Sequence, residues 1–144
     1  MVTVDAVVIG AGFAGLRALY RLRGIGKKVV VLEGSEGLGG VWYHNGYPGA
    51  RCDVESYDYS YSFSPELEQD WRWSERYATQ PEILRYINHV ADRFDLRKDI
   101  QFNTRMTNAT YDEALTRWTI ETEGGQIYQA QFYRLSVQNK IGTV

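Results

Sequence analysis

Near the amino end of the chain, two apolar runs flank a stretch in which leucines recur with the spacing of a helix. Apolar residues occupy position 4, positions 6–9 and positions 29–32, which predicts two buried strands. Between them, three leucines recur near the helical period, at Leu16, Leu19 and Leu22. Three arginines of the same stretch are predicted to be solvated, Arg17, Arg21 and Arg23. The pattern predicts a helix over 14–23 and therefore a β-α-β unit with parallel strands.

Residues 34–79 show no persistent hydrophobic period, and glycines and prolines break the backbone repeatedly. A stretch this long without regular structure is unusual in a small domain unless it has a function. We expect it to wrap a ligand.

Regular structure is predicted again from Thr79 onward. Thr79 and Glu82 have the spacing of a capping box, and Pro81 suits a first helical turn. One apolar face follows, made of Ile83, Ile87, Val90, Ala91 and Phe94. Alternation over 99–104 then predicts a strand.

Two antiparallel hairpins are predicted in the last part of the chain. Alternating segments begin at Thr107, Trp118 and Ile127, with turns at 112–114 and 124–125. We therefore expect one domain over 1–144 of the α/β class, with a Rossmann-like parallel sheet. An antiparallel β-meander over about 105–131 is expected to interrupt that sheet.

Composition narrows the class of protein. Of 144 residues, 44% are hydrophobic and 24% charged, as in globular domains. The net charge of −2 gives no broad basic field, so no nucleic-acid partner is expected. No apolar run approaches the ~20 residues of a membrane span, and the first strand begins too near Met1 for a signal peptide. The single cysteine, Cys52, fits a cytoplasmic location, and His44 and His89 are too isolated for a metal site.

The turn between the first strand and helix carries three glycines, Gly10, Gly12 and Gly15. Their spacing is that of a dinucleotide-binding turn, in which the first permits a tight bend and the second admits a pyrophosphate. The third lets helix and strand pack closely. The helix then presents its amino end to the phosphates.

Glu33 follows the second strand, where a carboxylate can accept a hydrogen bond from a ribose hydroxyl. The same carboxylate repels a 2′-phosphate, so NADP is disfavoured at this site. FAD and NAD remain as candidates.

The segments Gly39–Ser56, Tyr59–Ser64 and Trp73–Ile83 resemble the Baeyer–Villiger monooxygenases, flavoproteins that bind FAD and use NADPH and O₂. The similarity covers roughly 3–133 and is greatest to phenylacetone, steroid and cyclohexanone-type enzymes. It implies an FAD-binding amino-terminal region of an enzyme that converts a small ketone to an ester or lactone.

The resemblance also implies roles for particular residues. The turn from Gly39 to Trp42 lies along the cofactor, Asp53 lies beside the flavin ring in a supporting catalytic role, and Tyr59 is a weaker flavin contact. Trp42 could equally fill the core, and Asp53 could cap a turn. The candidate cofactor-binding residues are Gly10, Gly12, Phe13, Ala14, Gly15, Glu33, Gly39, Gly40, Val41, Trp42, Asp53 and Tyr59.

The chain also departs from the family pattern. It lacks the separate glycine-rich turn that holds NADPH in the family, the FxGxxxHxxxW fingerprint, the catalytic arginine and the last strand of the sheet. Arg134 and Ser136 stand where a central parallel strand is expected to be apolar. We therefore expect a truncated chain that is inactive alone. Three alternatives stay open: a standalone dinucleotide-binding module, an NAD-linked oxidoreductase domain, and a chain that does not fold stably.

Overall fold

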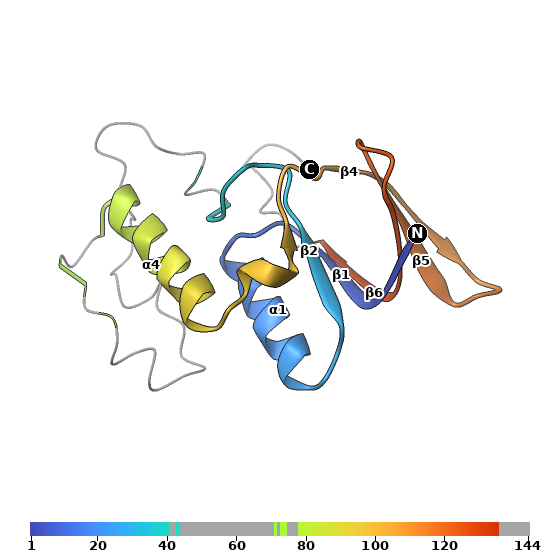
Figure 1. The fold of residues 1–144 in the computed structure, drawn as a ribbon, viewed down its shortest axis with the longest axis horizontal. Coiled ribbons are helices and arrows are strands. Elements are labelled where there is room, and N and C mark those ends of the chain that lie inside the picture. The colour runs from blue at the N-terminus through green and yellow to red at the C-terminus, as the bar shows by residue number, and fades with distance from the viewer. Residues whose placement is uncertain (41–42, 44–70, 72, 75–77, 136–144) are drawn as a thin grey trace.

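The structure is a computed structural model, and it describes residues 1–40, 43, 71, 73–74 and 78–135. The elements, in chain order, are β1 (Val2–Ile9), α1 (Phe13–Gly24), β2 (Val29–Leu32), α4 (Gln80–Arg93), η2 (Arg97–Asp99), β3 (Ile100–Gln101), β4 (Met106–Asp112), β5 (Arg117–Thr122) and β6 (Ile127–Leu135). The strands form one six-stranded sheet in the order β3-β2-β1-β6-β5-β4 (Figure 1).

The sheet is mixed. Strands β3, β2, β1 and β6 are parallel neighbours, whereas β4 and β5 run antiparallel. Strand β6 belongs to both parts, because it pairs antiparallel with β5 and parallel with β1. The predicted fold class, a Rossmann-like sheet with an antiparallel meander, is confirmed.

Side chains of β2 alternate between the two faces of the sheet, and all four are buried. Val29 and Val31 join the core under α1 and α4, while Val30 and Leu32 join a second core with side chains of β4, β5 and β6. A strand covered on both faces needs apolar residues at every position, which explains its unbroken apolar run. In Figure 1 the two helices lie on one side of the parallel strands, and β4 and β5 lie on the other.

The carboxyl half of β6 has a neighbour on one side only within the described part of the chain. Its pairing with β5 ends at Ala130, whereas its pairing with β1 continues to Leu135. Phe132 and Leu135 are exposed there, and Arg134 pairs in register with Val8. A charged residue at this position is therefore solvated, although the strand is parallel and continuous. Ser136 lies outside the described residues.

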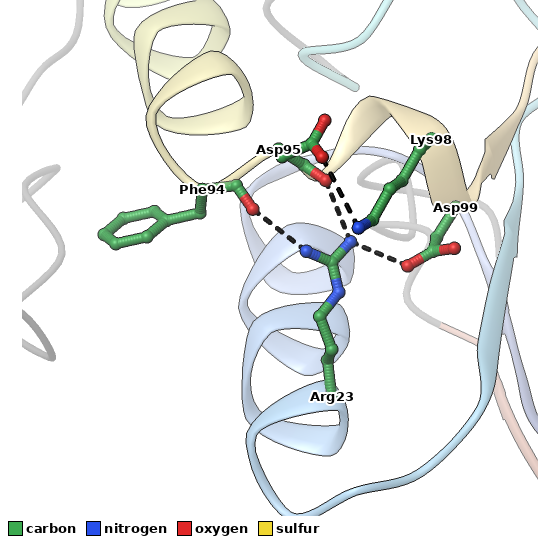
Figure 2. A network of polar contacts seen from close by, with 5 residues as sticks. All are labelled: Arg23, Phe94, Asp95, Lys98 and Asp99. Carbon is green, nitrogen blue, oxygen red and sulfur yellow. Dashed lines mark hydrogen bonds and ion pairs between the residues drawn. The ribbon is translucent and has the colours of Figure 1, made fainter.

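Helix α1 begins one residue before and ends one residue after the predicted span, and Leu16 and Leu19 are buried as expected. The prediction that Arg23 is solvated is wrong. Its guanidinium donates hydrogen bonds to the carbonyl oxygens of Phe94 and Asp95 and to the carboxylate of Asp99 (Figure 2). Arg23 therefore ties the end of α1 to the turn that follows α4.

Helix α4 begins after Thr79, with Pro81 in its first turn, and four residues of its predicted apolar face are buried, Ile83, Ile87, Val90 and Ala91. Phe94, the fifth, is the C-cap of the helix and is half-buried. The predicted capping box is wrong. Thr79 makes no side-chain cap hydrogen bond, and the Glu82 carboxylate instead accepts hydrogen bonds from the Ser74 amide at 3.3 Å and hydroxyl at 2.6 Å. Glu82 is buried, so a tertiary partner has replaced the local one.

Strand β3 is much shorter than the predicted 99–104. Asp99 belongs to η2, and only Ile100 and Gln101 pair with β2. Thr104 instead donates its amide hydrogen to the carbonyl oxygen of Glu33, so this segment still crosses the end of β2. Most of the predicted cofactor-wrapping segment, 34–79, lies outside the described residues.

Candidate functional site

The glycine turn joins β1 to α1 at the carboxyl edge of the parallel strands. Gly10 has a φ of +100°, a region that side-chain-bearing residues rarely adopt, so the bend requires glycine here. Its amide donates a hydrogen bond to the carbonyl oxygen of Leu32, at 2.9 Å, which ties the turn to the end of β2. Sheet edges of this kind, where the strand order reverses, are where ligands bind to open α/β folds.

Gly12 differs from Gly10 because nothing in its described surroundings requires a glycine. Its φ of −88° suits any residue, and an added Cβ would lie 3.5 Å from the Cα of Gly40, an ordinary contact. The missing side chain leaves the backbone open to close approach by a group from outside the chain. That is the role expected of the second glycine in a dinucleotide-binding turn.

Gly12 is also the amino-terminal cap of α1. No side chain caps this end of the helix, and its first turn contains no acidic residue. The positive end of the helix dipole is therefore not neutralised by α1 itself, which favours an anion. Ala14 is exposed at this end, Gly15 is buried, and the Phe13 ring lies 6.2 Å from that of Tyr86 in α4.

Glu33 follows β2 at the same edge and is only 8% exposed. Its Oε1 accepts a hydrogen bond from the Ala11 amide and its Oε2 accepts one from the Ser35 amide, both at 2.8 Å. Each carboxylate oxygen has a second acceptor site, so Glu33 can still accept hydrogen bonds from ribose hydroxyls. Sequence reasoning placed Glu33 at this edge but missed both amide partners, which no local pattern reveals.

A second glycine turn, made of Gly39 and Gly40, packs directly against the first, which holds Gly10 and Gly12. The Gly39 amide donates a hydrogen bond to the carbonyl oxygen of Ala11 at 2.9 Å. A Cβ on Gly40, whose φ is +58°, would lie 3.1 Å from the Cα of Gly12. The structure thus brings Gly10, Gly12, Glu33, Gly39 and Gly40 together at one edge.

Other predicted site residues cannot be placed. Val41, Trp42, Asp53 and Tyr59 lie outside the described residues, as do His44 and Cys52. Within the described part of the chain, no group of three His, Cys, Asp or Glu side chains is arranged to hold a metal ion.

Tyr43 is a neighbour of the site that the sequence did not single out. Its ring lies over Gly37, where an added Cβ would be 2.5 Å from Cε2, and its hydroxyl donates a hydrogen bond to Glu36 at 3.2 Å. Loss of solvent contact, followed by the negative charge and hydrogen bond of Glu36 and the charge of Glu33, raises the pKa of Tyr43. The folded structure therefore favours the neutral phenol of Tyr43, whose ring packs against Gly37.

The aromatic residues Trp71 and Trp73 pack against Tyr86 of α4, with ring centroids 5.3 and 5.0 Å away. Both indoles border the core under α1 and α4. These tryptophans therefore serve packing. No helix of the described chain is long and apolar enough to cross a membrane.

Comparison with known proteins places these features in a family. Residues 8–72 match the family of NAD(P)-binding Rossmann-like domains. The acetone monooxygenase (methyl acetate-forming) of Gordonia sp. strain TY-5 is 48% identical over 130 residues, 90% of this chain and 24% of that protein. A Baeyer–Villiger monooxygenase of Pseudooceanicola batsensis is 47% identical over 129 residues, 89% of this chain and 24% of that protein.

Solved structures agree. Oxidized steroid monooxygenase bound to NADP is 61% identical with a TM-score of 0.91, over 93% of this chain and 26% of that one. A complex of OTEMO with FAD and NADP is 41% identical with a TM-score of 0.89, over 94% of this chain and 26% of that one. The chain thus spans about a quarter of the length of the relatives it matches. Over nearly all of its length, the chain is therefore similar to one quarter of the Baeyer–Villiger type of flavin monooxygenases.

Proposed function

We propose that this chain is the FAD-binding region of an NADPH- and O₂-dependent Baeyer–Villiger-type monooxygenase. The observation that carries the proposal is Gly12, where neither the backbone conformation nor the described packing requires glycine. Close approach by a pyrophosphate accounts for it, and Glu33 lies at the same edge to receive the ribose. The FAD- and NADP-bound relative supports the choice of flavin.

The chain's own residues would divide the work of binding. Backbone amides at the start of α1 would face the pyrophosphate, with the helix dipole favouring its negative charge. Glu33 would accept hydrogen bonds from the ribose hydroxyls at its remaining acceptor sites. When bound, the flavin supplies the redox chemistry, and the protein orients it and excludes water. Val41 and Trp42 beside the flavin, Asp53 in support of catalysis and Tyr59 as a flavin contact remain part of the proposal.

Conversion of a small ketone to an ester or lactone is proposed for the whole protein. The chain spans about a quarter of its relatives, so we propose that it binds FAD without oxygenating ketones by itself. Coupled consumption of NADPH and formation of a lactone by the purified chain would contradict this. A cytoplasmic location is part of the same proposal, supported by the single cysteine of the sequence.

Retention of cofactor tests the proposed function directly. The purified chain is dialysed against FAD, NAD and NADP in parallel, and the bound nucleotide is released by denaturation and identified. We expect retained FAD and a yellow protein. Retention of NAD without FAD would instead make the chain an NAD-linked domain. Retention of none of the three would contradict a nucleotide-binding function.

A further inference from the structure

Ala11 is the residue on which the two glycine turns and Glu33 converge. Its side chain is fully buried in the core under α1 and α4. Its amide donates to Glu33 at 2.8 Å, and its carbonyl oxygen accepts from the Gly39 amide at 2.9 Å. Both backbone polar groups and the side chain of Ala11 are therefore held by tertiary contacts.

This arrangement sets the direction of the peptide groups that follow. In a trans peptide the N–H points opposite to the C=O of the preceding residue, and the structure contains no described cis peptide. Since the Ala11 carbonyl points at Gly39, the Gly12 amide hydrogen points away from the second glycine turn. The orientation of the phosphate-binding backbone thus depends on contacts with Glu33 and Gly39.

We propose that Glu33 is a positioning residue for the phosphate-binding turn as well as a ribose ligand. Its carboxylate holds the Ala11 amide and, together with Gly39, sets the turn before any nucleotide arrives. The ribose and pyrophosphate parts of the site are thereby coupled through one carboxylate. This inference rests on the proposed nucleotide-binding function.

The Ser35 amide makes the carboxylate chemically specific. Two amide hydrogens point at Glu33, one at each oxygen, so both atoms must be acceptors. In Glu33→Gln one of the two positions becomes an NH₂ donor facing another donor, and one backbone amide loses its partner. Hydrogen bonds to a charged group are also stronger than those to a neutral amide. Glu33→Gln should therefore loosen the turn even where no ribose hydroxyl is present.

A ligand without ribose hydroxyls separates the two roles. Dissociation constants are measured by calorimetry for ADP and for 2′,3′-dideoxy-ADP with the wild-type chain, Glu33→Gln and the control Glu36→Gln. Glu36 is exposed and undergoes the same chemical change three residues away. We expect Glu33→Gln to weaken the dideoxy ligand by about tenfold or more, the size of a lost hydrogen bond to a charged group. Glu36→Gln should stay within about twofold of the wild type. Unchanged affinity of Glu33→Gln for the dideoxy ligand would overturn the proposal.

The ligand-free chain gives a second measurement. The Ala11 amide should exchange its hydrogen slowly in the wild type and about tenfold faster or more in Glu33→Gln. Unchanged exchange would also overturn the proposal. If Glu33→Gln does not fold, the wild type alone gives the test, because rapid exchange of its Ala11 amide would also overturn the proposal. Failure of the wild type to bind ADP or FAD would contradict the proposed function. The exchange rate of the Ala11 amide would still test whether Glu33 holds the turn, because it is measured without a ligand.

Discussion

Arg23 of α1 and Asp99 of η2 are 76 residues apart in the chain, and they form an ion pair of 2.7 Å between Nη2 and Oδ2. The same guanidinium donates to the carbonyl oxygens of Phe94 and Asp95, at 2.9 and 3.0 Å. The side chains of Arg23 and Asp99 are 28% and 33% exposed, so water screens this pair only in part. Figure 2 shows the planar fork of Arg23 reaching all three oxygens, and Lys98 pairing with Asp95 beside it.

Arg23→Ala should therefore destabilise the chain although Arg23 is far from the glycine turns. We expect a loss of about 1–3 kcal/mol in the free energy of unfolding, measured by urea denaturation, because two carbonyls and a carboxylate lose their donor. Arg17→Ala, on an exposed position of the same helix, is the control and should change it by less than about 0.5 kcal/mol. Equal effects of the two variants would contradict the structural role of Arg23.

Gly12→Ala should separate binding from stability. The backbone and the described packing accept a Cβ at this position, so the free energy of unfolding should change by no more than about 0.5 kcal/mol. The methyl group would stand between the backbone and a pyrophosphate, so FAD affinity should fall by about tenfold or more. Gly124→Ala, where an added Cβ meets nothing within 4 Å, is the matched control and should leave FAD affinity unchanged. Undiminished FAD affinity of Gly12→Ala would argue against the proposed phosphate site.

Gly40→Ala, unlike Gly12→Ala, should lower the free energy of unfolding. Its φ of +58° is strained for alanine, and the new Cβ would lie 3.1 Å from the Cα of Gly12, which is backbone and cannot move aside easily. We expect a loss of about 1–3 kcal/mol, measured by the same urea denaturation. A stability equal to that of Gly12→Ala would show that the two glycine turns do not pack as described.

Glu82→Ala should cost more than Thr79→Ala, the reverse of what a capping box predicts. Thr79 makes no cap bond, whereas buried Glu82 holds the amide and hydroxyl of Ser74. We expect losses in unfolding free energy of about 1–3 kcal/mol for Glu82→Ala and less than about 0.5 kcal/mol for Thr79→Ala. Thermal and urea denaturation measure both, and a larger loss for Thr79→Ala would restore the local capping interpretation.

Tyr128 provides a pH-dependent readout of the second core. Burial raises its pKa above the ordinary tyrosine value of 10.0. The folded state therefore favours the neutral phenol, and this contribution is fully present below the unfolded pKa. It is lost as the pH rises through the folded pKa. Tyr128→Phe should flatten the decline in melting temperature above about pH 10. An unchanged decline would indicate that Tyr128 is not buried in its neutral form.

Local patterns predicted the elements that depend on neighbours in the chain. The apolar run 29–32 became β2 with the same bounds, because a strand covered on both faces must be apolar throughout. The Gly10 bend and the start of α4, with Pro81 in its first turn, likewise follow from short-range backbone preferences. For the same reason the sequence placed Glu33 correctly at the end of β2, beside the glycine turn.

Partners distant in the chain were decided by the tertiary structure alone. Arg23 meets Asp99 only because α1 lies beside the turn that follows α4. Glu82 turns to Ser74, and the Glu33 carboxylate holds two backbone amides that no spacing in the sequence reveals. The dual pairing of β6 depends in the same way on how the sheet assembles. A polar side chain can form hydrogen bonds of similar strength with several donors and acceptors. The partner that it binds is therefore the one that folding brings within hydrogen-bond distance.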